Sequence, residues 1–305
     1  MSQDYWQVQN NAKVHKGPVE LDEAVISREI SLSDAGVNIF LTSSPGLPRD
    51  AVVKGCEHYG KSAWNTTARI DLDVRGSQVS FFLKLREGPN AGSMFEGEYK
   101  SMKLINKIIP DFSPEPIARG KLRNSDGYFI LFSFHHLSGG TPSIPDFPNA
   151  VAKLHNQSIN AEFLRTLNID PNPTGQFGFN VPTYNGTLEQ KNTWTDTWEE
   201  FYADEMRHML KLEEEARGPS EELQQLSGPF LDKVIPRLLR PLETGGRSIK
   251  PVLLHGDLWL GNVSTQTESE KPLILIEEMR KLVEKFSGDH IIEHQHIAQS
   301  TQADT

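Results

Sequence analysis

The chain has 305 residues, of which 37% are apolar and 24% charged, and its formal net charge is −10 at pH 7. This size and apolar content suit one large domain or two closely joined lobes and exclude wholesale disorder. The acidic balance argues against duplex nucleic acid or an anionic membrane as a partner. No apolar stretch reaches the roughly 18 residues of a membrane helix, and the N-terminus lacks a signal-peptide pattern. A single cysteine, Cys56, excludes an internal disulfide. We therefore expect a cytoplasmic protein.

Four segments in the first half of the chain have the residue alternation of β-strands, with turn residues between the members of each pair. They cover residues 66–74, 78–86, 117–122 and 128–134. In the second segment, a period of two places Phe82 and Lys84 on one face of the strand. The pattern predicts a small antiparallel sheet.

The segment between the second and third strands has the pattern of an amphipathic helix. Ser93 is followed three residues later by Glu96, which fits a capping box at a helix start, and Pro110 closes the segment. Apolar residues recur between them at helical spacing. The first half of the chain is therefore expected to be a sheet that carries one helix.

The composition changes after residue 134. Pro and Gly cluster at residues 139–148, which is typical of a linker. Helical patterns follow at residues 147–155, 193–216 and 220–239, and the last is interrupted near Pro229. The second half of the chain is therefore expected to be mainly helical.

Residues 252–262 read VLLHGDLWLGN, in which a short apolar strand runs into Asp257 and Asn262 follows five residues later. Kinases have this spacing in their catalytic loop, where the Asp accepts the proton of the substrate hydroxyl and the Asn holds a magnesium ion. The alternative interpretation is a turn that uses Gly, Asp and Asn for backbone reasons. We favour the catalytic loop.

Lys84 on its strand and Glu98 on the neighbouring helix are candidates for an ion pair under a bound nucleotide. The ordinary alternatives are a surface lysine on an edge strand and a solvated helix carboxylate. The catalytic-loop pattern further along the chain favours the ion pair.

The form HGDLWxGN is narrower than the general kinase loop. It resembles the loop of the aminoglycoside-phosphotransferase-like group and, within that group, of the fructosamine/ketosamine-3-kinase family. The segment SFFLKL places Lys84 where this family has its ATP-phosphate lysine, and MFEGE resembles the family's helix signature with Glu98 as the lysine's partner. The resemblance spans roughly residues 54–276.

The resemblance implies an α+β, two-lobed protein-kinase-like fold. An antiparallel-sheet N-lobe with one helix would occupy residues 1–134 and bind the nucleotide, and a mainly helical C-lobe with the catalytic loop would occupy residues 135–276. A divergent tail, partly disordered, would follow at residues 277–305.

The resemblance also implies that ATP phosphorylates the 3-hydroxyl of a ketosamine, a fructosamine or ribulosamine on a free amine or a glycated protein, as deglycation repair. Asp257 would be the catalytic base, and Asn262 would hold Mg²⁺. Lys84, paired with Glu98, would position the phosphates.

Two stretches depart from the family pattern. The phosphate-binding loop reads EHYGKSAW, in which Gly60 is the residue expected to offer a backbone N–H group to a phosphate. After the apolar strand at residues 272–276, Glu277 stands where the family has a magnesium-binding Asp. Glu is a hard oxygen ligand, so Glu277 is the second expected metal ligand.

Other functions are compatible with the sequence. A catalytically inactive kinase-like binding protein, or a truncated or alternatively spliced gene product, would explain why the resemblance ends at Glu277. His290, Glu293 and His294 match the H-x-x-E-H zinc motif, although short motifs often match by chance. The preferred ketosamine and the oligomeric state are left open by the sequence.

Overall fold

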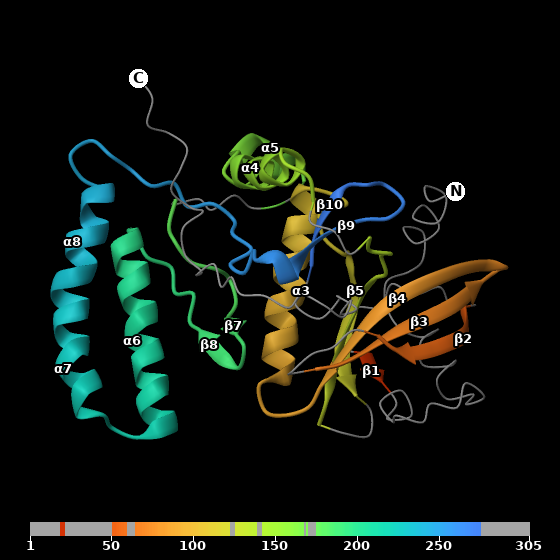
Figure 1. The fold of residues 1–305 in the computed structure, drawn as a ribbon, viewed down its shortest axis with the longest axis horizontal. Helices are drawn as coiled ribbons and strands as arrows, with labels where there is room; N and C mark the ends of the chain where they lie inside the picture. Colours follow the sequence, from red (N-terminus) through yellow and green to blue (C-terminus); the bar gives the residue numbers. More distant parts are fainter. Residues whose placement is uncertain are drawn as a thin grey trace.

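The computed structural model describes residues 19–21, 51–59, 65–122, 126–138, 142–167, 169 and 175–275. In this part of the chain, a twisted sheet packs on one long helix, and a mainly helical part lies on the other side of that helix (Figure 1). None of the described helices is long and apolar enough to cross a membrane.

The sheet has six strands in the order β1-β5-β6-β4-β3-β2. The strands are β1 (Val19–Leu21), β2 (Ala51–His58), β3 (Thr66–Val74), β4 (Ser77–Arg86), β5 (Pro116–Leu122) and β6 (Tyr128–Ser133). All four predicted strands are present. The neighbouring strands pair antiparallel except β1 and β5, which pair parallel, so the expected antiparallel sheet acquires one short parallel edge strand.

The two faces of β4 bury different side chains, as its period of two predicts. Phe81, Leu83 and Leu85 belong to one hydrophobic cluster, whose members among the described residues all lie on strands of the sheet. Phe82 belongs to a second cluster on the opposite face. Lys84 shares this second face because it follows Phe82 by two residues.

Helix α3 (Ala91–Ile108) packs on the face of the sheet that carries Phe82. The helix begins at Ala91 after Asn90, and the predicted capping box at Ser93 is therefore wrong. Ser93 already lies in the first turn, where its hydroxyl meets Tyr184 from a distant segment. The carboxylate of the other predicted capping residue, at position 96, instead forms an ion pair with a lysine one turn further along.

The helical part contains short helices, a small hairpin and one long helix pair. Its elements are α4 (Asp146–Ser158), α5 (Ala161–Thr166), β7 (Thr183–Asn185), β8 (Leu188–Gln190), α6 (Trp198–Arg217), α7 (Glu221–Pro229), α8 (Ile235–Leu239), β9 (Val263–Thr265) and β10 (Pro272–Ile274). A π-helical segment, Phe230–Val234, joins α7 to α8 directly after Pro229, where the sequence predicts an interruption. Helix α6 begins five residues later than predicted because Thr197 caps it, accepting a hydrogen bond from Glu200 N.

The strand predicted at residues 252–254 is wrong. This apolar segment has no regular secondary structure and belongs to no sheet. Leu253 N donates to the Ser158 hydroxyl at the end of α4 instead.

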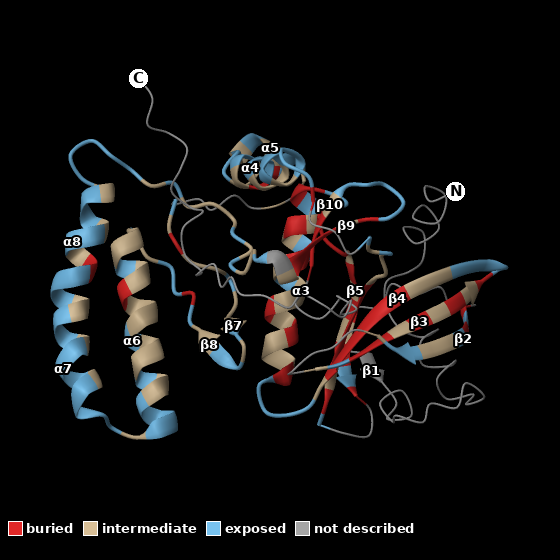
Figure 2. Cartoon of the chain, in the orientation of Figure 1, coloured by how far each residue is buried: buried red, intermediate tan, exposed pale blue. Residues whose placement is uncertain are grey.

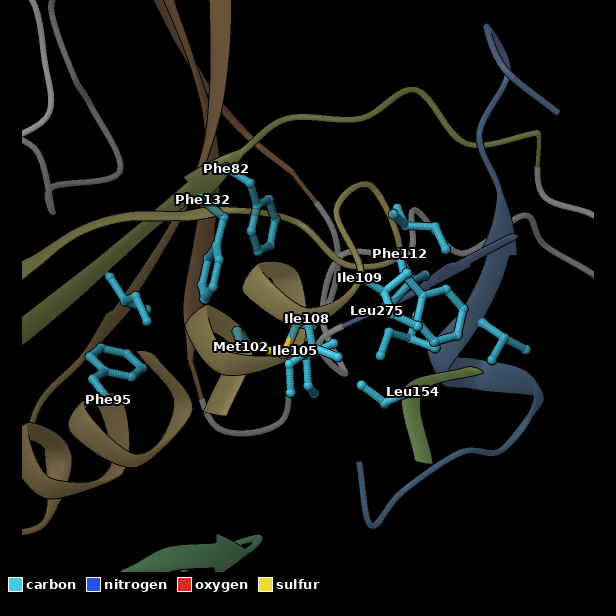
Figure 3. Close-up of a cluster of buried hydrophobic side chains, with 14 of the residues drawn as sticks. Phe82, Phe95, Met102, Ile105, Ile108, Ile109, Phe112, Phe132, Leu154 and Leu275 are labelled. Carbon is cyan, nitrogen blue, oxygen red and sulfur yellow. The ribbon is translucent and has the colours of Figure 1, made fainter. Parts of the chain in front are cut away.

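One buried cluster joins the sheet, α3 and the helical part. Phe82 from the sheet, Met102 and Ile105 from α3, Leu154 from α4 and Leu275, which directly follows β10, all belong to it (Figure 3). Figure 2 shows that buried residues concentrate around this junction, whereas α6, α7 and α8 are mostly half-buried or exposed. The cluster therefore fixes the sheet and the segment of residues 252–262 relative to each other.

Candidate active site

Lys84 and Glu98 form an ion pair between the sheet and α3. Lys84 Nζ donates to both carboxylate oxygens of Glu98, at 2.8 and 3.0 Å. The lysine side chain is only 3% exposed and the glutamate side chain 20% exposed. A charge this far removed from water needs an opposite charge, so the pair holds both side chains in one geometry.

Local sequence explains why these two residues face each other. Lys84 alternates with Phe82 on β4, and α3 buries Phe95 and Met102 against the same side of the sheet. Glu98 lies one turn after Phe95, near that packed face. The structure therefore brings together the lysine and the glutamate that the sequence singles out.

Asp257 and Asn262, the second pair of predicted residues, meet in the predicted catalytic loop. Asn262 Nδ2 donates to Asp257 Oδ2 at 2.6 Å and to the Asp257 carbonyl at 3.0 Å. The Asn262 side chain is buried, and a 3-10 turn at Leu260–Asn262 brings it back to the aspartate. The five-residue spacing therefore closes a small loop around the Asp257 carboxylate.

Glycines shape this loop at two points. Gly256 has a φ of +89°, a backbone conformation that L side chains rarely adopt, so the turn before Asp257 requires glycine. A Cβ atom on Gly261 would lie 2.2 Å from the Trp259 ring, so this glycine lets the indole fold over the backbone. The glycines at positions 256 and 261 of the motif are thus explained by the path of the backbone around Asp257.

The His255 ring contacts the main chain of the loop. Asp257 N donates to His255 Nδ1 at 3.3 Å. Burial lowers the pKa of His255, while Asp257 and a hydrogen bond with the Leu275 backbone oppose this shift. A neutral imidazole that accepts at Nδ1 is therefore favoured. The sequence places His255 inside the motif, but only the structure shows its contacts with both the loop and the end of β10.

The loop is also tied to β10 through the main chain. Leu275 N donates to the Asn262 carbonyl at 2.7 Å, and Asn262 N donates to the Trp259 carbonyl at 2.9 Å. Leu275 is fully buried in the cluster that contains Phe82. The same core thus supports the Lys84–Glu98 pair and the catalytic loop, and it sets their relative positions.

Asn262 has the features of a magnesium ligand. Its Nδ2 atom is used by Asp257, whereas its buried Oδ1 atom has no hydrogen-bond partner in the part of the chain that the structure describes. Mg²⁺ prefers oxygen ligands, and a buried amide oxygen without a partner beside a carboxylate suits it. The residues present therefore fit a magnesium ion.

Several predicted positions lie outside the described residues: Gly60, Glu277 and the H-x-x-E-H segment at residues 290–294. Among the residues that the structure does describe, no group of three or more His, Cys, Asp or Glu side chains gathers as a metal site would require. Glu277 follows Leu275, which is bonded to the catalytic loop, by only two residues in the sequence. It therefore stays the predicted second ligand.

Comparison with known proteins identifies the family. Residues 61–276, more than half of the chain, match the model of the fructosamine kinase family. The chain is 32% identical over 235 residues to ketosamine-3-kinase of Mus musculus, which covers 73% of this chain and 71% of that protein. It is 28% identical over 205 residues to the chloroplastic protein-ribulosamine 3-kinase of Arabidopsis thaliana, which covers 64% of this chain and 53% of that protein.

A solved structure described as a fructosamine-3-kinase from Haemophilus somnus shares the fold, with a TM-score of 0.53 at 18% identity over 73% of this chain and 65% of that one. The chain thus spans about half the length of the Arabidopsis protein and about two thirds of the Haemophilus one. The family expected from the HGDLWxGN loop is confirmed: this chain belongs to the fructosamine kinase family, a family of phosphotransferases, and has its two-lobed kinase-like fold.

Proposed function

We propose that this chain transfers the γ-phosphoryl group of ATP to the 3-hydroxyl of a ketosamine, either a fructosamine or a ribulosamine, on a free amine or a glycated protein. The observation that carries the proposal is the Asp257–Asn262 pair, held on the same core as the Lys84–Glu98 pair. Family membership supports the substrate class. Because a ketosamine 3-phosphate is unstable, the reaction would serve deglycation repair.

Asp257 is the proposed base. Its carboxylate accepts the proton of the 3-hydroxyl as that oxygen bonds to the γ-phosphorus, and ADP leaves with the electron pair of the broken P–O bond. The hydrogen bond from Asn262 Nδ2 fixes the orientation of the carboxylate. His255 accepts a hydrogen bond from the main chain of the aspartate and so helps to hold its backbone.

Lys84 is proposed to position the phosphates. Its ammonium group is oriented by Glu98, so a fixed positive charge faces the groups on which negative charge accumulates. The N–H group of Gly60 would add a backbone donor in the phosphate-binding loop.

Asn262, through Oδ1, and Glu277 are the proposed magnesium ligands. When bound, the ion neutralises charge on the transferring phosphate. Glu277 is one methylene longer than the family's aspartate, and a displacement of about 1 Å is poorly tolerated in such sites. We therefore expect turnover to be low.

The lobes are proposed to divide where the sequence places them: an N-lobe at residues 1–134, a C-lobe at residues 135–276 and a tail at residues 277–305. The end of β6 at Ser133 and the start of α4 at Asp146 support the first boundary.

A matched set of substrates tests this function. The chain is incubated with Mg-ATP and a fructosamine, a ribulosamine or the fructosamine that lacks the 3-hydroxyl, and the products are followed by phosphorus NMR. We expect a phosphate ester with the first two and none with the 3-deoxy compound. An ester on the 3-deoxy compound would contradict the proposed position. Binding of Mg-ATP without any ester would instead favour a non-catalytic kinase-like binding protein.

A further inference from the structure

We propose that the segment of residues 181–192, here called the β7–β8 hairpin, holds α3 in the position at which Glu98 reaches Lys84, with Gly97 and Tyr184 as positioning residues. The proposal rests on the proposed function insofar as the Lys84–Glu98 pair is the nucleotide-phosphate site. It concerns a contact between α3 and the hairpin, which lies between α3 and α6 in Figure 1.

Gly97 is the first contact point. It is buried, and a Cβ atom built on it would lie 2.5 Å from the Pro182 carbonyl oxygen and 3.5 Å from the carbonyl carbon. Both are backbone atoms, so a rotamer change could not relieve the clash. Glycine stabilises a helix interior less than alanine does. Its presence here therefore reflects the close approach of the hairpin rather than the stability of the helix.

Tyr184 is the second contact point. Its hydroxyl oxygen lies 2.9 Å from Ser93 Oγ and 2.8 Å from Glu189 Oε2. An ionised carboxylate only accepts, so the phenolic proton goes to Glu189, and the Ser93 hydroxyl can donate to the phenolic oxygen. Ser93 and Gly97 are four residues apart and share one face of α3. The hairpin thus contacts the helix at two points one turn apart.

The hairpin is anchored on its other side as well. Within the hairpin, Asn192 Nδ2 donates to the Val181 carbonyl at 3.0 Å and to Thr183 Oγ1 at 2.8 Å. Asn192 N donates to Glu205 Oε1 on α6 at 2.8 Å. The Asn192 side chain is buried, which makes these bonds costly to lose. A chain of direct contacts therefore runs from α6 through the hairpin to α3.

The position of α3 decides the geometry of the ion pair because the two partners stand on different elements. Lys84 belongs to the sheet, whereas Glu98 directly follows Gly97 on the helix. A shift of α3 away from the hairpin moves the Glu98 carboxylate relative to Lys84 Nζ, and active sites tolerate about 1 Å of misplacement badly. The hairpin therefore acts on the nucleotide site through Glu98.

The test uses Gly97→Ala and Tyr184→Phe, with Gly228→Ala and Tyr202→Phe as matched controls. Gly228 lies in α7 with open space around its Cβ position, and Tyr202 is a half-buried tyrosine on α6. The readouts are the Kd for Mg-ATP by calorimetry, amide hydrogen exchange of residues 91–108, and Tm. We expect Gly97→Ala to weaken Mg-ATP binding about tenfold and Tyr184→Phe about fivefold, with faster exchange in α3. The controls should leave the Kd and the exchange unchanged.

A double-mutant cycle with Glu98→Gln separates positioning from a general loss of stability. If Gly97 acts through Glu98, Gly97→Ala changes the Kd little in the Glu98→Gln background. An equal change in both backgrounds would overturn the proposal. Should Gly97→Ala fail to fold, Tyr184→Phe carries the same cycle. Glu98→Gln could leave the Kd for Mg-ATP unchanged while Gly97→Ala still speeds amide exchange in α3. That result would support the contact between the hairpin and α3 and contradict the role of the ion pair in nucleotide binding.

Discussion

Asn262 Nδ2 donates a 2.6 Å hydrogen bond to Asp257 Oδ2, so the two predicted site residues of the segment 252–262 are joined directly. This bond uses the amide nitrogen and turns the amide oxygen of Asn262 away from the aspartate. In the proposed mechanism one side chain therefore has two tasks, orienting the proposed base and offering an oxygen to the proposed magnesium ion.

Replacing Asp257 by Asn should remove the base and preserve the loop. The new amide oxygen can still accept from Asn262 Nδ2, so we expect Tm to stay near that of the wild type. Turnover of a ketosamine should fall by about 10²–10⁴-fold, the usual contribution of a general base. Asp126→Asn, at an exposed position paired with Lys121, is the control. Turnover within about twofold of the wild type, well short of that contribution, would show that Asp257 is not the base.

Replacing Asn262 by Ala should change the magnesium requirement. The variant loses the buried Oδ1 atom and the hydrogen bond that orients Asp257, so we expect a lower kcat and a higher magnesium concentration at half-maximal turnover. A magnesium titration of turnover measures both. Asn106→Ala, which removes another partly buried side-chain bond to a carbonyl, is the control. An unchanged half-maximal concentration would exclude Asn262 as a metal ligand.

Replacing Lys84 by Met should abolish stabilisation by nucleotide. A ligand that binds only the folded chain raises its apparent stability, by about 2.7 kcal/mol at a concentration of about 100 times the Kd. Mg-ATP should therefore raise the Tm of the wild type and of Lys121→Met, an exposed lysine on β5, but not that of Lys84→Met. The same Tm increase in all three proteins would show that Lys84 does not contribute to nucleotide binding.

Acid should destabilise the chain through three half-buried histidines. Burial lowers the pKa of His255 below its ordinary value of 6.5 and acts in the same direction on His135 and His155. Below about pH 6.5 the unfolded chain therefore binds more protons than the folded one, and the free energy of unfolding decreases as the pH falls through the folded-state pKa values. The full contribution to stability is present above about pH 6.5.

Urea unfolding between about pH 5 and 7.5 measures this dependence. His255→Asn should flatten it, because the variant removes one of the titrating groups, whereas His58→Asn at an exposed position should not. We would be wrong that folding lowers the pKa of His255 if the free energy of unfolding were constant over this range. The same holds if it changed with pH equally in His255→Asn and the wild type.

Replacing Glu277 by Asp should raise turnover, because the shorter side chain restores the length that the family pattern has at the metal. Glu277→Gln should lower it by removing the charge. Ketosamine phosphorylation at saturating magnesium measures both. If Glu277→Asp lowers turnover as much as Glu277→Gln does, the glutamate itself is the fitted ligand and the expected low activity is wrong.

Local sequence determined much of this protein. Strand period two assigned Phe82 and Lys84 to one face, Pro229 predicted the interruption between α7 and α8, and the HGDLWxGN loop predicted the family. These features depend on residues a few positions apart, whose geometry the backbone fixes by itself. The spacing of Asp257 and Asn262 is such a pattern, whereas the fold class was expected from the resemblance to a family and the Lys84–Glu98 contact joins two elements.

The tertiary structure decided the features that depend on distant partners. Ser93 fits a capping box locally, yet its hydroxyl meets Tyr184, 91 positions away in the sequence. The apolar segment at residues 252–254 belongs to no sheet, and Leu253 N donates to the Ser158 hydroxyl instead. The close approach of Gly97 to a carbonyl of the hairpin is likewise invisible to periodicity. Hydrogen bonds and close approaches of this kind are made only after the elements have packed, which is why no local pattern encodes them.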